Sequence, residues 1–154
     1  MKKVFISFLL IFSLGSTMAF TGKVKVASIN DKVKESFSKK FEGAQSVQWK
    51  DLGDYQEAIF LIDGHLVDAY YNTDGELEGF GRNILIDELP LTVKISLKNH
   101  FKDANDFDNI WEISNADGAS YWLTVKAPNK TKRVQVTPSG TILNISKEKQ
   151  NNRF

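Results

Sequence analysis

Two stretches of the chain carry apolar residues four positions apart, over residues 31–41 and about 89–101. Such spacing places the apolar side chains on one side of a helix and the charged ones on the other. Ser28 or Asn30 is suited to cap the first helix, and Gly43 lies where a helix commonly stops. The sequence therefore predicts two amphipathic helices. Their buried stripes are Val33, Phe37 and Phe41, and then Val93, Leu97 and Phe101.

β-rich runs fill most of the remaining chain, and turn residues separate them. Asp63-Gly64 and Thr73-Asp74-Gly75 are typical of hairpins, because glycine adopts the positive φ that tight turns require. A meander of antiparallel strands is the simplest arrangement. The expected strands are 46–50, 55–62, 65–72, 76–86, 110–114, 120–127, 133–137 and 141–146.

The two halves of the chain share the order of these elements. The apolar stripe of the first helix recurs 60 positions further on, and residues 72–77 match residues 137–142 at a spacing of 65. Loop insertions explain the change of spacing. We predict an internal duplication with repeats at about 28–86 and 87–146. A unit of about 60 residues is marginal by itself, so the two sheets are expected to share one continuous core.

Several segments of the first half also carry a family pattern. They are Val33-x3-Phe37-x3-Phe41, Gly43-Ala44-x2-Val47-x-Trp49, Tyr55-x2-Ala58-x-Phe60 and Ala69-Tyr70-Tyr71-Asn72-x-Asp74-Gly75-Glu76-Leu77. Over nearly all of residues 28–145 the chain resembles the exported PepSY-like, beta-lactamase-inhibitor-protein-like family of Bacteroidetes. The resemblance implies an α+β fold of two tandem PepSY-like repeats. Each repeat would be a helix packed on an antiparallel sheet of three or four strands, with the two sheets joined into one continuous sheet. The family name implies a protein partner bound on a concave sheet face.

The first 19 residues have the pattern of a cleavable secretion signal. Two lysines precede the apolar run 4–14, and Thr17 and Ala19 occupy the −3 and −1 positions of a cleavage site. The run is well short of the roughly 20 apolar residues that cross a bilayer. We predict cleavage near Ala19 and a single domain, residues 20–154, in the periplasm or outside the cell.

Charge and cysteine content restrict the partners. Removal of the signal lowers Lys plus Arg from 20 to 18 against 19 Asp plus Glu, a formal net charge of −1. That balance predicts no nucleic acid partner and no membrane contact beyond the transient signal. The chain has no cysteine, which excludes disulfides, thiolate metal sites and lipid attachment through an N-terminal cysteine.

The sequence shows no pattern of catalytic or metal-binding residues. His65 starts a strand and His100 ends a helix, and no nucleophile elbow is present. The acidic loop 103–109 lacks the order of an EF-hand, because Phe107 occupies a ligand position. We therefore predict a non-enzymatic protein with no cofactor and no metal.

Aromatic residues on the expected strands are the strongest functional signal. In the adjacent pairs Tyr70–Tyr71 and Tyr121–Trp122 the two side chains must face opposite ways, and alternation with their neighbours favours Tyr70 and Trp122 as the outward members. Outward Tyr and Trp side chains anchor protein partners or sugars. The alternative is that all are ordinary core or half-buried strand residues. The candidate binding residues are Trp49, Tyr55, Tyr70, Trp111 and Trp122.

Together these features predict an exported binding module that recognises an unknown envelope protein or peptide through the exposed face of its sheet. A periplasmic protein that binds a small ligand or a glycan through the same aromatic residues is the alternative.

Overall fold

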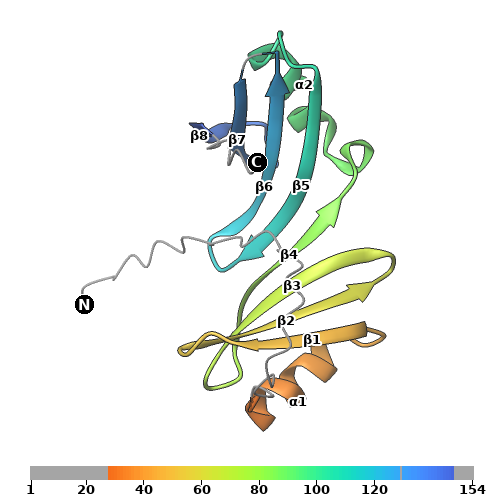
Figure 1. Cartoon of the computed structure of the whole chain (residues 1–154), viewed down its shortest axis with the longest axis vertical. Helices are drawn as coiled ribbons and strands as arrows, with labels where there is room; N and C mark the ends of the chain where they lie inside the picture. Colours follow the sequence, from red (N-terminus) through yellow and green to blue (C-terminus); the bar gives the residue numbers. More distant parts are fainter. Residues whose placement is uncertain (1–27, 129, 148–154) are drawn as a thin grey trace, which may run out of the picture.

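The computed structural model describes residues 28–128 and 130–147 (Figure 1). Eight strands form one antiparallel sheet and follow one another in chain order, so the predicted meander and continuous sheet are confirmed. Helix α1 (Asp31–Lys40) precedes the first strand, and the 3-10 turn η1 (Ile86–Glu88) and helix α2 (Leu91–His100) follow the fourth. The strands are β1 (Gln45–Asp51), β2 (Tyr55–Ile62), β3 (His65–Asn72), β4 (Leu77–Ile84), β5 (Asp106–Asn115), β6 (Gly118–Ala127), β7 (Lys130–Val136) and β8 (Ile142–Lys147). The expected signal peptide and the last residues of the chain lie outside the described residues.

The helix ends follow from local hydrogen bonding. The Asn30 side chain accepts a hydrogen bond from the backbone N–H of Lys32 at 2.9 Å, so Asn30 caps α1. Helix α2 starts two residues later than expected. Pro90 has an extended ψ of 144° and is the cap residue rather than part of the first turn, with its carbonyl accepting the N–H of Lys94.

Both helices pack on the same side of the sheet. Phe80 and Ile84 lie on β4 an even number of residues apart, so their side chains share a face. Phe80 packs against the hydrophobic cluster of α1 and Ile84 belongs to that of α2. We call the opposite side the helix-free face. Its central residues are Glu57 and Ile59 on β2, Asp68 and Tyr70 on β3, Gly79 and Gly81 on β4, Trp111 and Ile113 on β5, and Trp122 on β6.

The hydrophobic core is divided into two clusters, and the prediction of one continuous core is wrong. One cluster gathers under α1 around Phe37 and Phe60, and the other under α2 around Leu97 and Leu123. The division falls at Arg82, which lies on the helix side of β4 between Phe80 and Ile84. The Arg82 guanidinium is paired with Glu112 at 2.6 Å, and this polar pair separates the two apolar clusters. Figure 1 shows β1–β3 running across the direction of β5–β7, with β4 between them.

The two halves repeat one contact between a turn and a helix. Gly75 and Gly140 have φ values of +84° and +89°, and each lies against the first turn of the helix in its own half. A β-carbon on Gly75 would lie 3.0 Å from backbone atoms of Lys32, and one on Gly140 would lie 2.8 Å from the Thr92 carbonyl oxygen. This contact and the shared element order agree with a duplication, which itself stays a prediction.

Tyr71 buries a polar hydroxyl group in the hydrophobic cluster beneath α1. The side chain is fully buried and its hydroxyl has no hydrogen-bond partner among the described residues. An unsatisfied buried hydroxyl costs roughly 1–3 kcal/mol, so Tyr71→Phe should raise the free energy of unfolding by up to about 2 kcal/mol. In the matched variant Tyr121→Phe, stability should fall, because the Tyr121 hydroxyl donates to Glu112 at 2.9 Å. Urea denaturation of both variants tests this, and a loss of stability in Tyr71→Phe would contradict it.

Candidate functional site

Four of the five candidate aromatic residues lie on the helix-free face. They are Tyr55 on β2, Tyr70 on β3, Trp111 on β5 and Trp122 on β6. Trp111 and Trp122 are direct register partners on neighbouring strands, so their rings come from adjacent positions of the sheet. The Arg133 guanidinium lies 5.5 Å from the centre of the Trp122 ring. These residues come from both halves of the chain.

Trp49 lies on the other side of the sheet. Its ring packs edge-to-face on Phe37 of α1 with ring centroids 5.1 Å apart. It shares this side of β1 with Val47, which also packs against the α1 cluster. Trp49 therefore stabilises the fold and is not part of the helix-free face.

The predicted directions of the two aromatic pairs are confirmed. Tyr71 and Tyr121 are buried in the clusters beneath α1 and α2, whereas Tyr70 and Trp122 face the other way. Trp111, although a predicted binding residue, is buried, with only 5% of its surface accessible. Its indole N–H donates to the Asn109 side chain at 3.0 Å.

Two glycines leave the middle of the helix-free face without side chains. A β-carbon on Gly81 would lie 3.4 Å from the Trp111 ring and 3.6 Å from Ile113, and one on Gly79 would lie 3.0 Å from the Ser114 carbonyl oxygen. Glycine inside a strand is typical of a bulge or a close backbone approach. Both occur here, because the β3–β4 register shifts at Tyr70 and the Ser114 carbonyl lies close to Gly79.

The same face holds two buried carboxylates, Glu57 and Asp68, that are absent from the candidates predicted by the sequence. Glu57 accepts a hydrogen bond from the Tyr70 hydroxyl at 2.8 Å and lies 3.1 Å from the Lys50 ammonium. Asp68 is 8% exposed, and its Oδ1 has no hydrogen-bond partner among the described residues. Burial raises the pKa of Asp68 to about 6, the charge of Glu57 adds to this, and Lys50 opposes it. Burial and the hydrogen bond to Glu57 also raise the pKa of Tyr70.

The sequence contains a signal for these carboxylates. Glu57 and Asp68 stand within the runs Tyr55–Ile62 and His65–Asn72, which are otherwise rich in apolar residues. A charged residue inside such a strand is unusual enough to mark a site when the strand is central in the sheet.

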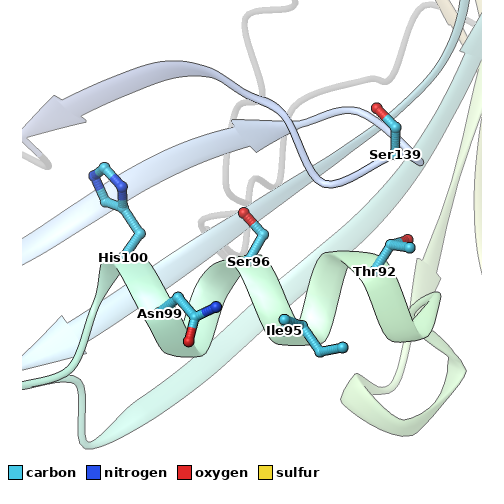
Figure 2. A pocket seen from close by; sticks show the side chains of 6 residues that line it. All are labelled: Thr92, Ile95, Ser96, Asn99, His100 and Ser139. Carbon is cyan, nitrogen blue, oxygen red and sulfur yellow. The ribbon is translucent and has the colours of Figure 1, made fainter.

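A second candidate is an open hollow of about 540 Å³ along the outer side of α2 (Figure 2). Thr92, Ser96 and His100 lie along one side of the helix, with Ser139 of the β7–β8 turn nearby. Nucleophilic catalysis needs a base within hydrogen-bond reach of the nucleophile. Within residues 28–128 and 130–147, no hydrogen bond joins His100 to either serine, and the His100 ring instead contacts Phe101. The hollow therefore lacks a catalytic pair.

The described part of the chain offers no cluster of three or more His, Cys, Asp or Glu side chains that could hold a metal ion. No helix in that part is long and apolar enough to cross a membrane.

Comparison with known proteins defines the class of fold. No protein-family model and no curated protein matches the chain. Solved structures do match. A DUF2874 family protein from Bacteroides uniformis has a TM-score of 0.71 at 17% identity, covering 77% of this chain and 89% of its own. A BLIP-like (beta-lactamase-inhibitor-protein-like) protein from Bacteroides fragilis has a TM-score of 0.68 at 15% identity, with coverages of 80% and 90%.

A third match is a candidate periplasmic protein from Bacteroides eggerthii, with a TM-score of 0.69 at 20% identity and coverages of 76% and 87%. At these identities the matches establish a shared fold. The resemblance to beta-lactamase-inhibitor-protein-like proteins of Bacteroidetes is thus confirmed for the fold, and the link to PepSY stays a prediction.

Proposed function

We propose that this chain is an exported, non-enzymatic binding module, built from two tandem repeats, that recognises a protein or peptide of the cell envelope through its helix-free face. The observation that carries the proposal is the placement of both helices on one side of the sheet. The opposite side presents Tyr70 and Trp122 from different halves of the chain, with no described helix over them.

The character of the helix-free face supports a polypeptide partner. Aromatic residues combined with arginine are enriched where proteins bind one another, and Arg133 lies over the Trp122 ring. The residues involved extend over strands β2 to β7, which is broader than a single sugar ring requires. The names of the matching structures, BLIP-like and candidate periplasmic, agree with an exported module of this kind.

A binding experiment tests the face directly. The chain from residue 20 onward, immobilised and exposed to envelope extract, should retain a stoichiometric partner. The double variant Tyr70→Ala, Trp122→Ala should bind that purified partner at least tenfold more weakly, because aromatic anchors of an interface each contribute on the order of 2 kcal/mol. Affinity is measured by titration calorimetry.

The matched control removes exposed apolar side chains elsewhere. Leu91 and Ile95 of α2 are 70% and 50% exposed, and Leu91→Ala, Ile95→Ala should leave binding unchanged. Binding that survives the face variant would show that the partner uses another surface. A thermal shift with sugars, and none with envelope proteins, would favour the glycan-binding alternative instead.

A further inference from the structure

Asp68 is a buried carboxylate that lacks a full set of hydrogen-bond partners among the described residues. It is more than nine-tenths buried, and one of its oxygens has no hydrogen-bond partner among the described residues. Buried charges in proteins are normally paired or fully hydrogen-bonded, because an unpaired one loses its hydration without compensation. Such a group in a folded chain points to a partner that is supplied from outside.

The cation that neighbours Asp68, Lys50, already forms an ion pair with Glu57. Lys50 on β1 lies 3.1 Å from Glu57, and the Tyr70 hydroxyl donates to the other oxygen of the same carboxylate. Glu57 is therefore satisfied on both oxygens, while Asp68 is not. The two carboxylates share one lysine, so this part of the helix-free face carries an excess of negative charge.

The surroundings of Asp68 are apolar, and the side chains of the neighbouring strand pack over the glycine beside it. On β2 its register partner is Ile59, and on β4 it is Gly81, which has no side chain. Beyond Gly81 lie Trp111 and Ile113, whose side chains approach the position that a β-carbon of Gly81 would take. Asp68 therefore lies among two isoleucines and an indole ring, so a group that pairs with the carboxylate must also contact these apolar side chains.

We propose that Asp68 is the anchor for a lysine or arginine side chain of the partner polypeptide, with the aliphatic part of that side chain packed against the apolar side chains of Ile59, Ile113 and Trp111. This inference rests on the proposed function of the helix-free face. A Lys or Arg side chain fits both features, because its stem is apolar and its head is a cation that forms charge-assisted hydrogen bonds. An indole ring adds a favourable surface for a guanidinium or ammonium group.

A metal ion fits this position less well than an organic cation. Hard cations such as Ca²⁺ take six or more oxygen ligands, and this position offers two carboxylates, one of them already engaged with Lys50 and Tyr70.

The experiment is a selection from displayed random nine-residue peptides on the immobilised chain at pH 7.5. We expect the selected peptides to share a lysine or arginine. A synthetic selected peptide should bind at least tenfold more tightly than its analogue with norleucine at that position. Asp68→Asn should abolish this difference, whereas Asp87→Asn, an exposed carboxylate of η1, should keep it.

The pH dependence of peptide binding provides an independent test of the anchor. Between pH 7.5 and pH 5 the lysine peptide should lose its advantage over the norleucine peptide, since Asp68 takes up a proton near pH 6. Glu57, Lys50 and Tyr70 are the titratable groups that face Asp68 from β1, β2 and β3, and Glu57→Gln should keep the direction of the pH effect. β4 contributes Gly79 and Gly81, and β5 contributes Trp111 and Ile113, none of which titrates.

Two negative results have different meanings. Peptides that bind without a basic residue and bind Asp68→Asn equally well would overturn the anchor and leave polypeptide binding intact. A wild-type chain that selects no peptide would overturn the anchor, and the polypeptide-binding function would be overturned with it if envelope extract also yields no partner.

Discussion

Asp68→Asn should raise the free energy of unfolding at pH 7.5 by up to about 3 kcal/mol. Burial raises the pKa of Asp68 from 3.8 to about 6. Each unit of such a difference between the folded and unfolded chain is worth about 1.4 kcal/mol, which sets the upper bound. Asparagine keeps the shape of the side chain and removes the charge that burial disfavours. Guanidinium denaturation followed by fluorescence measures the difference.

The stability gained by Asp68→Asn should depend on pH in one direction only. Because the pKa of Asp68 is higher in the folded chain, folding favours the protonated form. The destabilisation is therefore complete above about pH 6, declines as the pH falls, and is absent below the unfolded value near 3.8. The advantage of Asp68→Asn over the wild type should shrink in the same window and vanish near pH 4. The comparison of the two chains cancels the contributions of the carboxylates that do not interact with Asp68.

An exposed carboxylate serves as the control. Asp87→Asn should change stability by less than about 0.5 kcal/mol at either pH, because Asp87 is exposed on η1. A loss of stability in Asp68→Asn at pH 7.5 would mean that the folded chain already supplies a partner for the charge. A gain in stability combined with a loss of peptide binding is the usual pattern for a residue retained for function.

Much of the fold could be predicted because its signals are local. The stripes of α1 and α2 repeat at helical spacing, and glycine turns such as Asp63-Gly64 mark the hairpins. The order of strands followed because short turns join antiparallel neighbours. These features depend on residues close together in the sequence, which is why they could be recognised there.

The division of the core depends on contacts between distant residues. Phe80, Arg82 and Ile84 alternate along one strand, and the sequence shows a charged residue between two apolar ones. Whether Arg82 meets solvent or Glu112 depends on the register between β4 and β5, and α2 separates these strands along the chain. Alternation within a strand does not determine that register.

The candidate site shows the same difference between local and distant information. Tyr70 and Trp122 could be assigned from alternation within their own strands. The sequence predicts Trp49 as a binding residue, whereas its side chain packs, like that of Val47, against the α1 cluster. A charged residue in an apolar strand marks Asp68 as unusual, but its burial and its side of the sheet could not be predicted, because they depend on Ile59 and Gly81 on the flanking strands and on both helices covering the other side.

Gly140→Ala should lower the free energy of unfolding by about 2–5 kcal/mol. At a φ of +89° any side chain is strained, which costs roughly 1–2 kcal/mol. The new β-carbon would also lie 2.8 Å from the Thr92 carbonyl oxygen, so the β7–β8 turn or the first turn of α2 must move. Such overpacking adds roughly 1–3 kcal/mol. The movement would strain the hydrogen bond that the Thr92 hydroxyl donates to the Pro138 carbonyl at 2.7 Å. Urea denaturation measures the loss.

Variants of two other turn glycines separate the cost of backbone strain from the cost of overpacking. They also test whether the two halves of the chain are energetically coupled. Gly64 has a φ of +80° with nothing within 4 Å of its β-carbon position, so Gly64→Ala should show the backbone cost alone. Equal losses for Gly64→Ala and Gly140→Ala would mean that the turn and the helix are not tightly packed.

Gly75→Ala, against Lys32 at 3.0 Å, should resemble Gly140→Ala. Gly75 and Gly140 lie against the helices of two separate hydrophobic clusters. The stability lost by the double variant Gly75→Ala, Gly140→Ala should therefore equal the sum of the two single losses to within about 0.5 kcal/mol. A larger deviation would show that the two clusters are coupled through β4.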